Sequence, residues 1–270
     1  MRYRDMIQDD VPRVTDLAVS CFGPDKLWSW LYPRRNEHPD DLRRYMGLRV
    51  RQRLVEPGTR GIIAETEASD AEVAGFAFGA RNGGDEAAKK WEADCPAHSN
   101  LPQPRGCPPS GKCRRRRNAR IAEVERVLLR LHGWYYYQRF LDRATAWDRV
   151  QIFHESTAYE GFWRALDRET GSWHLAMLGV SAQQRRQGIG SSLVAWGKSR
   201  AGEEQVPATL EASAMGRALY AESSVRIVAR SGICDGPEGV VMMWEPDECR
   251  GRWLETEAED AKLRRPSREG

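Results

Sequence analysis

One stretch, from Trp173 to Ala201, constrains the fold of this chain more than any other. It begins with a short apolar run, Trp173 to Val180, which has the length of a buried strand. A polar turn with two adjacent arginines follows, and the residues from Gly188 to Ala201 have the apolar spacing of a helix. The stretch therefore predicts a strand, a basic turn and a helix that opens with glycine.

This turn has the chemistry of an anion site. The first N–H groups of a helix have no intrahelical partner, and the helix dipole adds partial positive charge, so a phosphate there would collect several hydrogen bonds. Gly188 and Gly190 lack Cβ atoms, which lets the backbone approach a diphosphate. Arg185 and Arg186 can add charge-assisted hydrogen bonds. A plain strand–turn–helix with chance glycines is the weaker interpretation, because arginines, glycines and serines occur here together.

The run Arg185-Arg186-Gln187-Gly188-Ile189-Gly190 matches the R-x-x-G-x-G/A signature of the GNAT acyltransferase superfamily, and LAMLGV before it is similar to that family's fourth strand. The chain thus resembles a fungal-type, single-domain GNAT member with a long insert. The resemblance implies an α/β (α+β layered) GNAT fold. Its mixed, mostly antiparallel central sheet is flanked by helices, and a helical or irregular insert separates the third and fourth strands.

The resemblance also implies acetyl-CoA as co-substrate. In the family the loop grips the pyrophosphate, and the fourth strand pairs through its backbone with the pantetheine arm. The cofactor-binding residues implied here are Leu178, Gly179, Val180, Arg185, Arg186, Gln187, Gly188, Ile189, Gly190, Ser191 and Ser192.

Composition limits the class of protein. The 270 residues are 40% hydrophobic and 30% charged, which allows a buried core in one large domain or one domain with an insert. The net charge of +3 is too small to argue for nucleic-acid binding. No apolar run approaches the ~20 residues of a membrane span, and the N-terminus lacks the apolar core of a secretory signal. We therefore expect a cytoplasmic or nuclear protein without a membrane partner, whose six cysteines are free thiols.

Punctuation and periodicity divide the chain into four parts. Residues 1–84 and 169–248 read as the two halves of the GNAT domain, residues 85–168 as an insert, and residues 249–270 as a charged tail. Helices are expected over residues 11–22, 39–55, 188–201 and 213–230. Strands are expected over residues 3–7, 61–65, 73–80, 173–180, 207–212 and 240–244.

The insert departs from the compact family pattern. Residues 81–118 are rich in Gly, Pro and charge, and predict irregular structure with a solvated basic run at residues 112–117. Residues 118–141 predict an amphipathic helix capped by Asn118, and residues 151–166 a further helical piece. The apolar positions of the first helix are Ile121, Val124, Val127, Leu128, Leu131, Trp134 and Tyr135. The insert is either packed on the domain's flank or a lid over the acceptor, and both interpretations stay open.

Four potential zinc ligands lie in the insert, namely Cys95, His98, Cys107 and Cys113. Their spacing is C-x-x-H followed by C-x-x-x-x-x-C, which is not a standard finger or ribbon spacing. We therefore expect no metal.

The acid of the reaction is implied by the resemblance. Residues 216–222, GRALYAE, resemble the family's pattern G-x-x-L-Y-E-x-x-G-F, and Tyr220 falls on the tyrosine that commonly protonates the CoA thiolate. Ser224-Val225 stand where Gly-Phe is usual, which puts the local geometry in doubt. The family's fourth-strand bulge, which frees a backbone N–H for the oxyanion, is expected at residues 177–179. The base is Glu211, His174 or a water chain.

An aromatic patch between the first two helices contains Trp28, Trp30 and Tyr32. It is either core packing or, as the resemblance implies, a wall of the acceptor pocket. The leading hypothesis is an N-acyltransferase that moves the acetyl group of acetyl-CoA directly to a small-molecule or peptide amine. The alternatives are an acyl-CoA-binding regulatory or scaffold protein, and a nucleic-acid-associated acetyltransferase using residues 114–117. A Rossmann nucleotide site is disfavoured by the position of the glycines.

Overall fold

The computed structural model describes residues 1–67, 71–94, 96–99, 111–138, 141–156, 160–231 and 239–255. The strands of these residues form one sheet in the order β1-β2-β3-β4-β5-β7-β6. Only β4 and β5 pair in parallel, and the other neighbours are antiparallel. This confirms the predicted mixed, mostly antiparallel sheet. The strands are β1 (Arg2–Asp5), β2 (Thr59–Glu65), β3 (Val73–Asn82), β4 (Ser172–Val180), β5 (Ala208–Ala212), β6 (Arg226–Ser231) and β7 (Gly239–Trp244).

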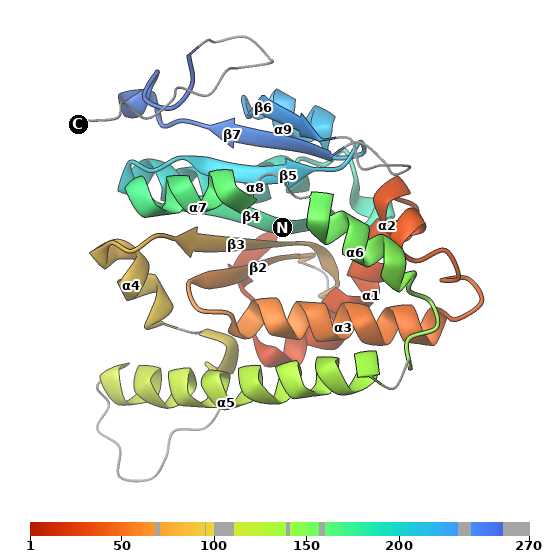
Figure 1. Cartoon of the computed structure of the whole chain (residues 1–270). Coiled ribbons are helices and arrows are strands. Elements are labelled where there is room, and N and C mark those ends of the chain that lie inside the picture. The colour runs from red at the N-terminus through yellow and green to blue at the C-terminus, as the bar shows by residue number, and fades with distance from the viewer. Residues whose placement is uncertain are drawn as a thin grey trace.

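Helices cover both faces of the sheet (Figure 1). Phe76 and Phe78 of β3 point toward α1 and α3, whereas Ala77 between them points toward α8, as the alternation of a strand requires. The helices are α1 (Val11–Phe22), α2 (Lys26–Leu31), α3 (Pro39–Val55), α4 (Glu86–Glu92), α5 (Gly111–Gln138), α6 (Trp147–Ser156), α7 (Glu160–Glu169), α8 (Ile189–Glu204) and α9 (Arg217–Glu222).

The N-terminal helices have the bounds that the sequence predicts. Helix α1 carries proline in its first turn and ends at Gly23, and α3 spans Pro39–Val55. Val14, Leu17, Ala18 and Cys21 are buried on one face of α1, as their spacing predicts.

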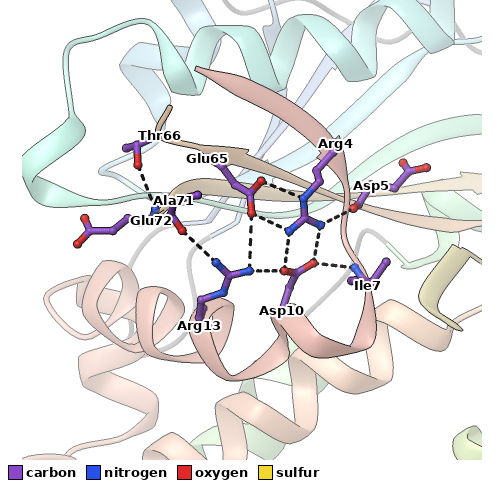
Figure 2. A network of polar contacts seen from close by, with 9 residues as sticks. All are labelled: Arg4, Asp5, Ile7, Asp10, Arg13, Glu65, Thr66, Ala71 and Glu72. Carbon is purple, nitrogen blue, oxygen red and sulfur yellow. Dashed lines mark hydrogen bonds and ion pairs between the residues drawn. The ribbon is translucent and has the colours of Figure 1, made fainter. Parts of the chain in front are cut away.

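A network of charged side chains ties β1, α1 and β2 together (Figure 2). Asp10 is 1% exposed, and Arg4 donates to its two carboxylate oxygens at 2.8 Å each. Arg4 also donates to Glu65 at 2.6 and 3.0 Å, and Arg13 donates to Asp10 at 2.6 Å. Burial acts to raise the pKa of Asp10, but hydrogen bonds from Arg4 and the Ile7 N–H outweigh it and hold the pKa below its usual range.

The prediction of one helix over residues 213–230 is wrong. Helix α9 ends at Glu222, and Ser224 then takes a left-handed conformation with φ of 60°. The chain continues as β6, which pairs with β7. Val225 and Ile227 are buried as predicted, but they alternate on an extended chain, a spacing that three apolar residues cannot distinguish from a helical one.

The insert is more helical than the sequence predicts. Helix α4 lies within residues 81–118, and α5 begins at Gly111, so the basic run at residues 112–117 is helical and Asn118 is buried inside the helix rather than capping it. The single helical piece expected over residues 151–166 is two helices, α6 and α7. Gly133 does not interrupt α5. It lies where the helix approaches α3, and a Cβ added there would lie 3.4 Å from the Leu48 side chain.

Helix α5 packs on the flank of the domain through an unexpected face. Ala122 and Leu129 are buried against α3, and Glu125 turns inward to Arg51 and His98. The predicted apolar positions, from Val124 to Tyr135, instead point away from the domain and are exposed. One alanine, one leucine and one acidic residue therefore lie on the packed face, whereas most of the apolar residues lie on the exposed face, which reverses the usual order of an amphipathic helix.

Candidate functional site

The turn between β4 and α8 has the geometry of an anion site. Arg186 and Gly188 both take left-handed conformations, with φ of 63° and 77°. These two turns direct the backbone into the first turn of α8, where the Ser192 N–H closes the first helical bond to the Gly188 carbonyl at 2.9 Å. The amides just before it therefore point out of the helix end. Arg185, Arg186 and Gly188 are exposed.

The two glycines of the signature act differently. A Cβ on Gly188 would meet nothing within 4 Å, so the space beside it is open to a ligand, and its positive φ favours glycine. A Cβ on Gly190 would lie 3.0 Å from a Leu219 methyl, so this glycine allows α8 to pack on α9. The space beside Gly188 leaves room for a diphosphate, and Gly190 packs closely against α9; that either glycine contacts a diphosphate stays a prediction.

Strand β4 leaves β5 at the centre of the sheet. Its pairing with β5 ends at Leu175 opposite Leu210, whereas its pairing with β3 continues to Val180. The backbone edge from Ala176 to Val180 that faces away from β3 is consequently not paired with β5. An extended ligand could pair with that edge as an added strand does.

A β-bulge lies where the two strands separate. Phe78 of β3 is opposite Met177 and the next residue is opposite Leu175, so Ala176 is the extra residue on β4. The bulge is therefore one position earlier than the predicted 177–179. Ala176 and Met177 both pack toward the α1 face, and Leu178 and Val180 pack toward α8. Gly179 lies where a Cβ would meet Phe76 at 2.6 Å and Cys21 at 3.3 Å, and the Cys21 thiol donates to the Val180 carbonyl at 3.2 Å.

Tyr220 lies on the α8 side of the separated strands. It is 8% exposed and belongs to the same apolar cluster as Leu178 and Leu210. Burial raises the pKa of its phenol to about 12, so the hydroxyl stays protonated at neutral pH. A protonated phenol can donate a proton to a thiolate.

His174 and Glu211 meet on the opposite face. The Trp163 indole of α7 donates to a Glu211 carboxylate oxygen at 3.1 Å and packs edge-on against the His174 ring at 5.6 Å between centroids. His174 Nδ1 lies 3.1 Å from the Thr209 hydroxyl. Burial lowers the pKa of His174 to about 4, so the ring is neutral at physiological pH. The structure thus brings both candidate bases together around one indole.

Sequence reasoning missed Trp163. No local pattern marks it, because it reaches β4 and β5 from the insert and the contact exists only once α7 lies across these strands (Figure 1). A tryptophan in a helix of an insert next to a catalytic domain is a weak signal by itself.

The aromatic patch is only partly open. Tyr32 is 2% exposed, packs with Tyr45 and Leu42, and has its pKa raised by burial, so its side chain belongs to the core. Trp28 stacks between Phe22 and Tyr32, with centroids at 5.2 and 5.4 Å. Trp30 is partly exposed, and the Arg149 guanidinium lies 5.6 Å above its ring. Core packing thus describes Tyr32.

Of the four potential zinc ligands, the structure describes only the surroundings of His98. Its Nε2 lies 3.1 Å from Glu125 Oε2, a contact within the insert that joins residues 96–98 to α5. Cys95, Cys107 and the side chain of Cys113 lie outside the described residues. Within the described ranges, no three His, Cys, Asp or Glu side chains converge, and Cys21 and Cys249 are free thiols, as predicted. No helix in the described part of the chain is long and apolar enough to cross a membrane.

No protein-family model matches the sequence, and no curated protein matches it. Solved structures do. One from Corynebacterium glutamicum, named as histone acetyltransferase HPA2 and related acetyltransferase, is 17% identical with a TM-score of 0.51, covering 90% of this chain and 94% of its own. Mosquito arylalkylamine N-acetyltransferase like 5b is 11% identical with a TM-score of 0.46, covering 90% and 99%. An aminoglycoside 6'-N-acetyltransferase complexed with coenzyme A is 11% identical with a TM-score of 0.42, covering 91% and 97%.

At these identities the similarity concerns architecture, and the first of the three carries it. The seven-stranded sheet, the parallel β4–β5 pair that separates at a bulge, and the turn into α8 agree with that architecture. This chain has the GNAT fold.

Proposed function

We propose that this chain is an acetyl-CoA-dependent N-acetyltransferase that transfers the acetyl group directly to a primary amine. The observation that carries the proposal is the turn from β4 into α8, with left-handed Arg186 and Gly188 beside open space. This turn follows a strand whose edge is free after Leu175. A diphosphate at the helix end and an extended pantetheine along that edge would use the two features together.

The two faces of the separated strands suggest a division of roles. In the transfer, the amine nitrogen forms a bond to the acetyl carbon, and the bond from that carbon to sulfur breaks. The amine loses a proton toward His174 and Glu211, and the sulfur gains one from the Tyr220 hydroxyl, which solvent then restores. The bulge at Ala176 supports an oxyanion contact there, because an extra residue leaves a backbone group outside the ladder.

Glu211 is the better candidate for the base. The His174 ring already packs against the Trp163 indole, and its Nδ1 lies 3.1 Å from the Thr209 hydroxyl. Glu211 is exposed, is held by a neutral donor, and can pass the proton through water. His174 then serves to orient the indole and the Thr209 hydroxyl rather than to take the proton.

The acceptor is a small-molecule or peptide amine that enters on the face of Trp163 and Glu211. Trp28 and Trp30 remain proposed for the acceptor wall, whereas buried Tyr32 supports the wall from behind. The division into GNAT halves around the insert at residues 85–168, the fungal-type membership and a cytoplasmic or nuclear location stay predictions.

A thermal shift experiment tests the cofactor site. At ~100 times its dissociation constant, acetyl-CoA stabilises the folded protein by about 2.7 kcal/mol, which raises the midpoint at roughly 2–4 °C per kcal/mol. Gly188→Glu is the control, because it adds a negative side chain in exposed space where φ is 77°. A shift in the parent that vanishes in the control supports the proposal, and no shift in the parent refutes it.

An acyl-CoA-binding protein without turnover is the second candidate. The observation in its favour is the left-handed Ser224 after α9, where the family pattern has Gly-Phe. Release of the CoA thiol in the presence of a panel of amines separates the two. An enzyme should lose turnover in Tyr220→Phe while its acetyl-CoA thermal shift persists, whereas a binding protein would show the shift with no thiol release in either form.

A further inference from the structure

The outward face of α5 carries exposed apolar side chains. Six of them are between 48% and 62% exposed, and Trp134 is the most exposed. They recur at intervals of three and four residues, so they form one stripe along the helix, opposite the buried Ala122 and Leu129. The stripe comprises Val124, Val127, Leu128, Leu131, Trp134 and Tyr135. An exposed apolar stripe rimmed by polar residues is the pattern that interaction sites show.

Positive charge accompanies the stripe. Arg120 lies one helical turn before Val124, and Arg130 flanks the stripe's centre; both side chains are exposed. Glu123 is an exposed acidic residue nearby, but Glu125 is turned inward and neutralised by Arg51 at 2.8 Å. The sequence of the first two turns of α5 adds Lys112 and residues 114–117, all arginine. The helix therefore combines an apolar stripe with two exposed arginines beside it and a basic sequence in its first turns.

We propose that α5 lies on the surface of an anionic lipid bilayer. Amphipathic helices with basic residues beside Trp, Tyr and Leu bury their apolar face at the headgroup boundary, and their arginines pair with lipid phosphates. The aromatic rings of Trp134 and Tyr135 have the mixed polarity that suits this boundary. Helix α5 runs along the outer edge of the molecule beyond α3, so a flat surface can reach the stripe (Figure 1).

Area and charge favour a bilayer over a second copy of the chain. The stripe from Val124 to Tyr135 is about 18 Å long and no wider than the helix, at roughly 10–12 Å. A stable protein interface buries about 800 Å² on each partner, which this stripe alone does not supply. Two copies would also bring two basic helices together, whereas anionic headgroups complement them. Surface binding needs no spanning helix, and it is independent of the proposed acetyl transfer.

Flotation of the full chain with phosphatidylcholine vesicles, with and without phosphatidylserine, tests the proposal. We expect binding only with phosphatidylserine, and its loss as salt screens the charges. Arg120→Ser with Arg130→Ser should lower partitioning about fivefold per arginine, and Leu128→Ser with Leu131→Ser should abolish it. Arg200→Ser with Arg250→Ser removes the same charge elsewhere, and should leave binding unchanged.

Several outcomes would overturn the proposal. One is an absence of binding to phosphatidylserine vesicles. Another is binding that the two leucine substitutions do not change. A third is a concentration-dependent dimer that those substitutions dissociate, without vesicle binding, which would make the stripe an interface between copies. All four substituted side chains on α5 are exposed, so the variants should keep the parent's melting curve, and that curve is measured alongside.

Discussion

Two clusters of arginine differ in what surrounds them. Arg4 lies between two buried carboxylates, Asp10 and Glu65, and its guanidinium is paired with both of them (Figure 2). Arg185 and Arg186 lie at the exposed start of α8, and among the described residues no carboxylate pairs with either. The first cluster holds the N-terminal part of the sheet together. The second has two arginines without a carboxylate partner among the described residues, just before the N–H groups that begin a helix, which is what an anionic ligand requires.

This difference separates charged residues that stabilise the fold from charged residues that can bind a ligand. Buried charges must be paired, because an isolated buried ion is costly, so a satisfied cluster needs no ligand to explain it. Exposed arginines near strained backbone have no such obligation. Left-handed Arg186 costs of order 1–3 kcal/mol, and its position beside Gly188 connects that strain to the proposed cofactor site.

The largest effect is expected from Asp10→Asn. Breaking a buried ion pair is costly, but Arg4 keeps Glu65 as a partner at 2.6 Å, so we expect a loss of about 3 kcal/mol in the free energy of unfolding, the lower end for a broken buried pair. Urea unfolding measures this loss. Acetyl-CoA should still raise the melting temperature of the variant, although that temperature starts lower than in the parent. If acetyl-CoA no longer raised it, the two arginine clusters would not be separate in function.

The pH dependence of stability is the next largest. His174 has a pKa of about 4 when folded and about 6.5 when unfolded, so the unfolded chain binds more protons between these values. Stability should therefore be complete above pH ~6.5 and fall by up to about 3 kcal/mol as the pH drops to ~4. The lowered pKa of Asp10 adds a second loss below that range.

Two variants assign these pH windows. His174→Gln should remove the change in stability between pH ~6.5 and ~4 and keep the loss at lower pH. Asp10→Asn should keep the first change and remove the second. Urea midpoints across the pH range measure both. A parent whose stability is constant from pH 7 to 4 would contradict the burial of a neutral His174.

Most of the fold could be predicted from the sequence, for reasons that particular residues make plain. Asp10-Val11-Pro12 and Gly23 bound α1 through local backbone chemistry, and the turn from β4 into α8 is equally local. The prediction for the segment after α9 is wrong because Ser224 takes the left-handed conformation that ends the helix, and no glycine marks that position in the sequence. The prediction of the packed face of α5 is wrong because apolar spacing shows only that a helix is amphipathic. It does not show which face meets the domain.

The candidate site was predictable in its loop and only in part in its chemistry. The residues of the proposed anion site lie in one turn, so a sequence motif can indicate them. Trp163 and Glu211 come from an insert helix and a strand 48 residues apart, and their hydrogen bond depends on tertiary packing. The sequence could not show the packing role of Gly190 either. A side chain there would meet Leu219 only because α9 packs against α8.

Arg185→Ala sharpens the comparison from the other side. Hydrogen bonds to charged groups contribute about 1.5–3 kcal/mol, and because the side chain is exposed we expect the lower part of that range, roughly a tenfold loss of acetyl-CoA affinity. Unfolding stability should stay within ±0.5 kcal/mol. Isothermal titration calorimetry at two salt concentrations measures the affinity. Arg200→Ala is the control, because it removes a partly exposed arginine of α8 that pairs with Glu203 at 2.7 Å, and an equal loss of affinity there would contradict a local contact.

Trp163→Phe should have the smallest effect. It tests whether a neutral hydrogen-bond donor positions the Glu211 carboxylate. Glu211 is an exposed carboxylate held by one neutral donor rather than by arginine, so losing the indole N–H should loosen it without unfolding the chain. A neutral hydrogen bond contributes about 0.5–1.5 kcal/mol, which predicts a roughly threefold to tenfold fall in kcat. Because phenylalanine keeps an aromatic ring against His174, the KM for acetyl-CoA should not change. Glu211→Gln should lower kcat further. If Trp163→Phe changes only the acceptor KM, the indole binds the acceptor and does not position Glu211.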